Sequence, residues 1–532
     1  MHTARLKFWG WGREDVVLSA QEIVALEGAY AKRFGLSGYE VTPTPRAEDI
    51  ALRQPRVTAP GSLADMCSVD HFERLLHSYG KSFFDCARAF ARDFSNPPDV
   101  IAFPRSEADV ITVLDWCDAI GAVVVPWGGG SSVVGGVEPP RTDRPVVTID
   151  LKHLDRVLEI DQTSQAARIQ GGIYGPSLEG QLKASGLTLR HFPQSFEFSS
   201  LGGWIATRGG GHYATLYTHI DEFVESLRVV TPAGTLESFR LPGSGAGPSP
   251  DRMFIGSEGT LGIITEAWMR LRKRPTFRAN TTARFGDFYR AAECVRAISQ
   301  AHLYPANCRL VDADEAQING AGDGSQSILV LTFESADSPQ EPHLQRALEI
   351  VRAHGGAYDE QALGREGAQR EGAAGQWRDA FIRMPYKREV LTPRGIIVET
   401  FETAITWDRF ADFHAQVKSA TEKAILEVTG KPGLVTCRFT HVYPDGPAPY
   451  FSLHAVGDKA RMIEQAWQIK IAASEVLNRL GGTITHHHAV GRDHRRWYDK
   501  QRPELFAQAM LAAKKRLDPK GMLNPGVLFD PD

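Results

Sequence analysis

The 532-residue sequence lacks a long apolar run, which excludes a membrane-spanning helix. Crossing a bilayer takes about 20 consecutive apolar residues, and no stretch of about 18 occurs here. The opening residues, MHTARLKFWGWGREDVVLS, do not combine an apolar core with a small-residue cleavage site, so we expect no secretory signal. The closing LFDPD differs from a peroxisomal tripeptide address. We therefore predict a cytoplasmic protein.

Cysteine is scarce, and its six occurrences form neither a disulfide pattern nor a metal-binding pattern. They are widely spaced, and no Cys-x-x-Cys pair occurs. This arrangement favours free thiols in a reducing compartment over a disulfide framework or a zinc site. The six residues are Cys67, Cys86, Cys117, Cys294, Cys308 and Cys437.

An excess of one charge is also lacking, because 60 Lys and Arg residues stand against 64 Asp and Glu residues. A formal net charge of -4, spread along the chain, gives no electrostatic basis for binding nucleic acid. The most basic short segment, RLRKRP at 270–275, is interpreted as a solvated strand end, with a phosphate track as the weaker alternative. Length and an apolar content of 42% predict at least two globular domains.

The order of apolar patterns predicts a mixed α+β chain. Helical pattern dominates from 19 to about 95, where Ser19 and Glu22 have capping-box spacing and Gly35 ends the first helix. Between about 98 and 275, short β-branched runs alternate with amphipathic helices, which indicates an α/β region. The runs expected to be strands are DVIAFP, AVVVPWGGG, VVTIDL, ARIQGG, VESLRVVTPAG and LGIITEAWMRL.

Two later segments have their own signals. GREGAQREGAAGQ, at 364–376, has the composition of a loop. The tail PELFAQAMLAAKKRLDPKGMLNPGVLF predicts an amphipathic helix with basic residues in its last turn, followed by a Gly/Pro-rich stop.

Three glycine- and serine-rich turns predict a site for a long dinucleotide. They are VVVPWGGGSSVVGG, which begins in a strand-like run, PQSFEFSSLGGWIATRGGG at 193–211 and GSEGTLGIITEA at 256–267. Consecutive glycines permit positive φ and let backbone N–H groups converge on an anion. The first turn matches neither GxGxxG nor GxxxxGK[ST], so Rossmann and Walker sites do not fit. The alternative is three unrelated surface turns.

PWGGGSS, GSEGTLGIIT and LDPKGMLNPG resemble the FAD-binding fold of the vanillyl-alcohol oxidase superfamily. The resemblance implies a two-subdomain FAD-binding domain in which the first turn holds the pyrophosphate. Members with covalent FAD often have a histidine where this chain has Gly130, so we expect non-covalent FAD. The residues expected to bind it are Pro126, Gly128, Gly129, Gly130, Ser131, Ser132, Gln194, Ser195, Phe198, Ser199, Ser200, Gly202, Thr207, Arg208, Glu258, Gly259, Gly262 and Ile264.

The same resemblance implies four regions. We expect a helical N-terminal region at 1–90, an FAD-binding domain at 91–275 and an α+β cap domain over the flavin at 276–500. Residues 501–532 are expected to pack back on the FAD-binding domain. Superfamily members often pair, so a homodimer is expected by analogy.

Longer motifs resemble one family, the alkyldihydroxyacetonephosphate synthases, also called alkylglycerone-phosphate synthases. The similar segments are KFWGWG, HSYGKSFFD, SFEFSSLGGWIATR, FETAITWDR and HHHAVG. Related flavin dehydrogenases of 2-hydroxy acids usually have Gly-Glu-His-Gly in place of HHHAVG. The resemblance implies FAD-dependent replacement of the acyl group of acyl-dihydroxyacetone phosphate by a fatty alcohol. This ether-lipid reaction would use a covalent flavin N5 adduct without net oxidation.

The family resemblance also suggests roles for single residues. Tyr450 falls at the position of the family's acid/base tyrosine and would need cationic neighbours to act near neutrality; otherwise it is a strand aromatic. Arg388 aligns with the arginine that binds the substrate phosphate, with a surface ion pair to Glu389 as the alternative. Arg309 matches another active-site arginine and is preferred over Arg438, which could equally be structural.

Three adjacent histidines stand in GGTITHHHAVGR, at 481–492. The β-branched run before them predicts that they finish a strand, with His486 and His488 on one face and His487 on the other. Such alternation argues against one metal held by all three, and we expect no metal. His486, His487 and His488 are catalytic candidates, with His487 or His488 preferred, and one face would meet flavin and substrate and exchange a proton near neutrality. The alternative is polar residues facing solvent.

Three functions stay open at this point. The first is the ether-forming transferase with lipid-like substrates, which predicts an alkyl-chain tunnel and some peripheral membrane contact at the inner face of a membrane. Phe8, Trp9 and Trp11 could supply that contact, with burial of these rings as the alternative. The second is an FAD-dependent oxidoreductase of a 2-hydroxy acid or alcohol, because fold alone does not fix function. The third is a non-catalytic flavin- or lipid-binding protein. The joint presence of Tyr450, Arg388 and the three histidines argues against this third function.

Overall fold

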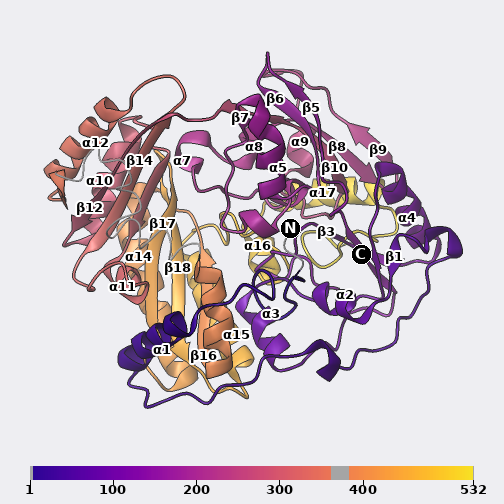
Figure 1. Cartoon of the computed structure of the whole chain (residues 1–532), viewed down its shortest axis with the longest axis horizontal. Helices are drawn as coiled ribbons and strands as arrows, with labels where there is room; N and C mark the ends of the chain where they lie inside the picture. The colour runs from indigo at the N-terminus through magenta and orange to yellow at the C-terminus, as the bar shows by residue number, and fades with distance from the viewer. Residues whose placement is uncertain (1–3, 361–382, 531–532) are drawn as a thin grey trace.

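The computed structural model describes residues 4–360 and 383–530. Figure 1 shows an indigo-to-magenta lobe that holds the smaller sheets, of four, five and two strands, beside a rose-to-orange lobe built on one sheet of seven strands. The segment 364–376, expected to be a loop, lies outside the described residues. The predicted α+β class is confirmed, with helices and sheets in both lobes.

The N-terminal region is less helical than its pattern predicts. Helix α1 (Ala20–Phe34) begins at the predicted capping box of Ser19 and Glu22, and Gly35 ends it with φ of 64°. The chain from 36 to 66 then holds only short 3-10 turns, because several prolines in this stretch remove backbone donors. The remaining helices of the region are α2 (His71–Leu76) and α3 (Phe83–Phe90).

The first small sheet has the order β1-β2-β4-β3, and its pairs β2-β4 and β4-β3 are parallel. Helix α4 (Glu107–Ala119) provides the crossover between β2 and β3, as the alternating pattern predicts. The valine-rich strand β3 is buried and ends at the first glycine turn. The strands are β1 (Cys67–Ser68), β2 (Val100–Ala102), β3 (Val123–Trp127) and β4 (Val146–Asp150).

The second small sheet is antiparallel, with the order β5-β6-β10-β8-β9. Within the α/β region expected over 98–275, parallel pairing therefore occurs in the first part and antiparallel pairing in the second. Each of the six predicted strand runs does contain a strand. Elements here are β5 (Val157–Asp161), β6 (Ala166–Gln170), α5 (Gly175–Leu182), β7 (Leu187–Thr188), α6 (Leu201–Ala206), α7 (Ala214–Tyr217), α8 (Ile220–Phe223), β8 (Val224–Thr231), β9 (Gly234–Glu237), α9 (Asp251–Phe254), β10 (Ile263–Arg270) and β11 (Arg272–Lys273).

The large sheet has seven strands in the order β15-β12-β14-β13-β17-β18-β16. Four helices, α10, α12, α14 and α15, contribute apolar side chains to the core on one of its faces. The strands are β12 (Phe277–Phe285), β13 (Asn307–Val311), β14 (Ser327–Ser335), β15 (Ala357–Tyr358), β16 (Ile396–Glu402), β17 (Leu434–Val442) and β18 (Pro447–Val456). The helices are α10 (Phe288–Gln300), α11 (Ala313–Ile318), α12 (Glu341–Ala353), α14 (Trp407–Thr429) and α15 (Met462–Arg479).

Strands β17 and β18 are buried on both faces, and their alternation separates two kinds of side chain. On β18, Phe451 and Leu453 belong to the apolar core under the helices. Tyr450, Ser452 and His454, one residue out of phase, line a cavity on the opposite face. The period of two along a strand thus places polar chemistry on the cavity side.

The C-terminal segment returns to the first lobe. Helices α16 (Arg495–Gln501) and α17 (Glu504–Leu517) lead into a stretch in which Leu523 forms a β-bridge with Val124 of β3. The buried Lys514 donates to the carbonyls of Thr260 (2.6 Å) and Leu523 (2.8 Å). In Figure 1 the yellow α17 lies against the magenta lobe.

Candidate active site

A cavity of about 310 Å³ is lined by the glycine turns of the first lobe and by the polar face of the seven-stranded sheet. It brings together every residue expected to bind the cofactor except Phe198 and Arg208, which do not line it. The lining residues from that set are Pro126, Gly128, Gly129, Gly130, Ser131, Ser132, Gln194, Ser195, Ser199, Ser200, Gly202, Thr207, Glu258, Gly259, Gly262 and Ile264.

The first glycine turn forms a cradle of backbone groups. A Cβ atom placed on Gly129 would lie 1.9 Å from the carbonyl oxygen of Phe198, so only glycine fits there. Gly130 has φ of 65°. Within the described part of the chain, no protein group accepts a hydrogen bond from the N–H groups of residues 129–132. Four successive donors left open toward a cavity suit a pyrophosphate, so this turn fits FAD.

Phe198 and Arg208 are placed differently from the rest of the second turn. The ring of Phe198 packs edge-on against Trp11, with centroids 5.6 Å apart. The guanidinium of Arg208 is more than half exposed and pairs with Asp221 at 2.8 Å. Phe198 therefore shapes the cradle through its carbonyl, while Arg208 stabilises a neighbouring turn.

The third turn joins the cradle to the chain that follows the histidines. The side chain of Glu258 accepts hydrogen bonds from the backbone N–H groups of Val490 and Gly491, both at 2.8 Å. Burial raises the pKa of Glu258 to about 7, although these two N–H groups and Arg492 oppose the shift. A buried carboxyl group thus holds the histidine segment against the glycine turn.

The three histidines lie in a loop of bends, so the prediction that they finish a strand is wrong. The cause is the buried carboxylate of Glu402, at the end of β16. It accepts hydrogen bonds from the backbone N–H groups of His486 (2.6 Å), His487 (3.2 Å) and His488 (3.0 Å) and from the Thr485 hydroxyl (2.6 Å). Successive N–H groups of a strand point in opposite directions, so they could not converge on one carboxylate.

His487 and His488 line the cavity, whereas His486 does not. The Nδ1 atoms of His486 and His487 lie 3.1 Å apart. Burial lowers the pKa of His486 and His488 to about 4, opposed by Glu402, and lowers the pKa of His487 well below its usual range. The imidazoles are therefore neutral near pH 7. Their pKa values lie below the range expected for groups that exchange a proton near neutrality.

Tyr450 is buried on β18 beside both cavity-lining histidines. Its ring centroid lies 5.3 Å from that of His488 and 6.0 Å from that of His487. The guanidinium carbon of Arg438 stands 3.8 Å above the phenol ring. Burial raises the pKa of Tyr450, while Arg438, Thr400 and Arg388 lower it. The expected cationic neighbours are present, but desolvation keeps the phenol protonated at neutral pH.

Arg388 lines the cavity from the helical segment 383–391 and donates to the carbonyl oxygen of Lys81 at 2.6 Å. Glu389 pairs instead with Lys7 at 2.5 Å, so the surface pair between neighbours is excluded. Lys81 also lines the cavity, and burial lowers its pKa to about 8. In the sequence, the motif HSYGKSFFD that contains Lys81 is the only signal for this residue.

Arg309 and Arg438 also line the cavity, on neighbouring strands. Arg438 forms an ion pair with Glu315, in which both side chains are 1% exposed. Nη2 of Arg309 lies 3.2 Å from Nδ1 of His212, and burial lowers the pKa of Arg309 to about 9. The buried ion pair with Glu315 indicates a structural role for Arg438, and Arg309 stays the preferred candidate for a substrate anion.

The N-terminal aromatic residues do not form an exposed patch. Phe8 is buried, and Trp9 and Trp11 are half-buried. Trp11 lines the cavity. These rings pack inside the N-terminal region and against the site, which agrees with the alternative of burial. Peripheral membrane contact of the protein stays a prediction. Among the described residues, no helix has both the length and the apolar character that crossing a bilayer requires.

Comparison with known proteins agrees with this geometry. A model of the FAD binding domain matches residues 98–240, and one of the C-terminal domain of FAD linked oxidases matches 274–528. The chain is 30% identical to an alkyldihydroxyacetonephosphate synthase of Dictyostelium discoideum, over 96% of this chain and 88% of the relative. The chain belongs to the alkyldihydroxyacetonephosphate synthase family. FAD is its cofactor, as predicted.

Two other members of the family and one more distant relative are also similar to this chain in sequence or structure. It is 30% identical to the enzyme of that name from Trypanosoma brucei brucei, over 87% of this chain and 78% of the relative. A solved alkyldihydroxyacetonephosphate synthase structure superposes with a TM-score of 0.82 and 26% identity, covering 98% of this chain and 99% of the other. Glycolate oxidase subunit GlcD of Bacillus subtilis is 27% identical, over 88% of this chain and 98% of the relative.

Proposed function

We propose that this synthase-family enzyme replaces the acyl group of acyl-dihydroxyacetone phosphate with a fatty alcohol, forming an ether lipid and releasing a carboxylate. The observation that carries the proposal is a single cavity in which a backbone cradle for FAD faces Tyr450, two neutral histidines and buried arginines. Bound FAD supplies an electron sink for the substrate carbon. The protein must then manage a proton, a phosphate and a leaving carboxylate.

Tyr450 is the proposed proton-transfer group. The phenol first passes its own proton to the neutral imidazole of His488, whose ring lies beside it. The phenolate oxygen then takes the proton from the substrate carbon and returns it after exchange. A buried phenol gives up its proton only if the resulting anion is stabilised, and Arg438 lies over the ring to do this. His488 and His487, next to the same ring, donate hydrogen bonds to the departing carboxylate. His486 supports them from behind, through its contact with His487.

Arg388 and Arg309 are the proposed phosphate ligands. Both line the cavity, and a guanidinium presents a planar fork that matches two phosphate oxygens. Lys81 adds a compact positive charge close to Arg388. Arg309 is buried and Arg388 and Lys81 are half-buried, so an anionic substrate that neutralises these cations gains binding energy.

The remaining features of the proposal concern the whole molecule. FAD is held without a covalent bond from the first turn, where Gly130 stands in place of a nucleophilic side chain. Residues 91–275 form the FAD-binding domain, and residues 276–500 form the cap. Residues 501–532 pack back on the FAD-binding domain, which the β-bridge between Leu523 and Val124 supports. The enzyme is cytoplasmic, as its buried free thiols support, and forms a homodimer, which size-exclusion chromatography with light scattering tests.

One assay tests the proposed reaction. The purified yellow protein is incubated with acyl-dihydroxyacetone phosphate and a radiolabelled fatty alcohol, and products are separated by chromatography. Labelled ether product, formed without a change in flavin absorbance at steady state, supports the proposal. Bleaching of the flavin by a 2-hydroxy acid, with no ether formed, would replace it by the oxidoreductase alternative. That alternative is favoured by the similarity to a glycolate oxidase subunit.

A further inference from the structure

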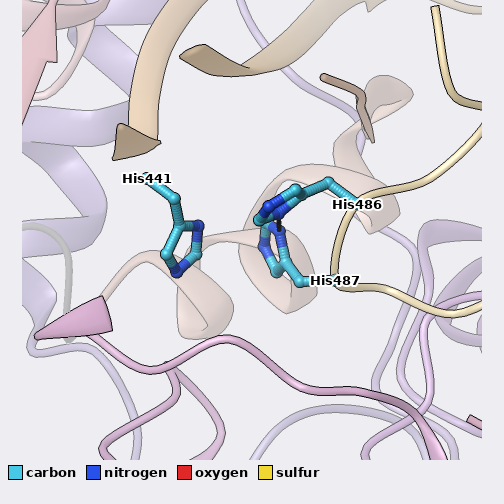
Figure 2. Close-up of side chains that lie close together, drawn as sticks. All are labelled: His441, His486 and His487. Atoms are coloured by element: carbon cyan, nitrogen blue, oxygen red, sulfur yellow. Dashed lines mark hydrogen bonds between the residues drawn. The ribbon is translucent and has the colours of Figure 1, made fainter. Parts of the chain in front are cut away.

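Three imidazoles from two distant parts of the chain form a compact cluster beside the cavity. His441 lies near the end of β17, and His486 and His487 lie in the loop held by Glu402. One ring nitrogen of each lies within 4.8 Å of one from both others. Figure 2 shows His441 facing the paired rings of His486 and His487 across a small gap.

The spacing of these nitrogens suits a tetrahedral metal ion. Zinc–imidazole bonds of about 2.0–2.1 Å place two ligand nitrogens roughly 3.3–3.4 Å apart. The Nδ1 atoms of His486 and His487 already lie 3.1 Å apart. Because these residues stand in a loop, the strand alternation that argued against a shared metal does not apply. Small side-chain rotations would bring the nitrogen of His441 into the same shell.

Outer contacts hold two of the rings in a ligating orientation. Nε2 of His441 lies 3.1 Å from the carbonyl oxygen of Gly211, and Nε2 of His486 lies 2.9 Å from the hydroxyl of Tyr443. Imidazoles that bind metals usually donate their other N–H to such a partner, which leaves Nδ1 to face the ion. Nδ1 of His441 now lies 3.1 Å from the Thr440 hydroxyl, which would give up this contact and keep its hydrogen bond to the carbonyl oxygen of Ala448 at 3.5 Å. In Figure 2 a nitrogen of His441 points toward the other two rings.

Two neighbours complete the surroundings of the cluster. The ring of His219 lies 5.1 Å from that of His486, and its buried Nδ1 has no hydrogen-bond partner among the described residues. The carboxylate of Glu402 lies 3.4 Å from Nδ1 of His487 and is 1% exposed. His219 or a water molecule can occupy the fourth position, and Glu402 supplies a compensating negative charge.

We propose that His441, His486 and His487 bind one Zn²⁺ ion per chain, and that the zinc-bound protein is an inhibited form of the enzyme. Three imidazoles select a borderline ion such as Zn²⁺ over Mg²⁺ or Ca²⁺, which take oxygen ligands. Inhibition follows because His487 also lines the cavity, and coordination withdraws it from the substrate. The inhibition rests on the proposed function, whereas the binding does not.

Binding is measured on the full-length, FAD-loaded protein after treatment with a chelator. Zn²⁺ is titrated by calorimetry, and Co²⁺ is titrated as an optical probe of tetrahedral nitrogen coordination in difference spectra above the flavin band. We expect one ion per chain. His486→Ala and His441→Gln should each weaken binding at least tenfold, while His302→Ala, at an exposed histidine outside the cluster, should leave it unchanged.

The outcomes separate the two parts of the proposal. Absence of one-to-one binding by the wild-type protein, or wild-type affinity in both cluster variants, overturns the site. Flavin absorbance and thermal unfolding of each variant show whether it is folded, and the metal spectra need no substrate. If Zn²⁺ binds with this stoichiometry but leaves ether formation unchanged at saturation, the inhibition is overturned and the site stands. If no ether forms under any condition, the proposed reaction fails, and the binding data still decide the site.

Discussion

The two sides of the cavity are built in different ways. The cofactor side consists of backbone groups from runs of adjacent residues, such as the open N–H groups of 129–132. The opposite side consists of side chains that are far apart in sequence, among them Arg309, Tyr450 and His487. A local sequence pattern can specify the first side, whereas the second depends on strand register and on loops fixed by distant partners. Substitutions should therefore separate loss of cofactor from loss of chemistry.

The largest effect is expected from Gly129→Val. The new side chain would collide with the carbonyl oxygen of Phe198, which a Cβ alone approaches to 1.9 Å. We expect a colourless protein with ether formation below detection, measured by the ratio of flavin to protein absorbance. Gly180→Ala is the matched control, because nothing lies within 4 Å of its Cβ position. A yellow Gly129→Val protein would contradict the cradle.

The same contrast explains how far the sequence could predict the structure. The capping box at Ser19, the strand before the first turn and the three glycine-rich turns follow from neighbours in the chain. The single residues expected to bind the cofactor come from the family resemblance, and all but Phe198 and Arg208 line the cavity. The histidine loop does not, because its shape is imposed by Glu402, which precedes it by more than eighty residues. His441 carries no local signal at all, since only the packing of β17 against the glycine-rich loop brings it to the site.

Tyr450→Phe should impair the chemistry on the side-chain side of the cavity and leave cofactor binding on the opposite side intact. Removing the hydroxyl removes the proposed proton-transfer atom, so we expect a fall in kcat of about 10³-fold with unchanged flavin content. Steady-state assay of ether formation and the flavin spectrum measure the two quantities. Tyr289→Phe, which loses a hydroxyl bonded to His414 away from the cavity, should retain activity. Equal losses in both variants would point to a general packing defect.

Glu258 connects the glycine turn on the cofactor side to the histidine segment on the opposite side. Its titration should therefore change the free energy of unfolding with pH. Its pKa is raised to about 7 by burial in the folded protein, so between pH 4.5 and 7 the folded chain holds a proton that the unfolded chain has released. Stability from this group is therefore lost as pH rises through that window, by at most about 3 kcal/mol.

Glu258→Gln removes that titration while keeping a similar shape. We expect the free energy of unfolding of the wild-type protein, relative to the variant, to fall between pH 5 and pH 8. Urea denaturation at the two pH values measures the difference. A constant difference across this range would show that Glu258 titrates normally in the folded protein.

Arg388→Lys should have the smallest effect on activity. It separates substrate binding from catalysis on the side-chain side of the cavity. Lysine keeps the positive charge but loses the planar fork, so we expect KM for acyl-dihydroxyacetone phosphate to rise about tenfold, equivalent to about 1.4 kcal/mol, with kcat and flavin content little changed. Arg394→Lys, at an arginine paired with Glu27 outside the cavity, should leave KM unaltered. If KM instead stays constant and kcat falls, Arg388 stabilises the transition state more than the bound phosphate, and Arg309 becomes the main phosphate ligand.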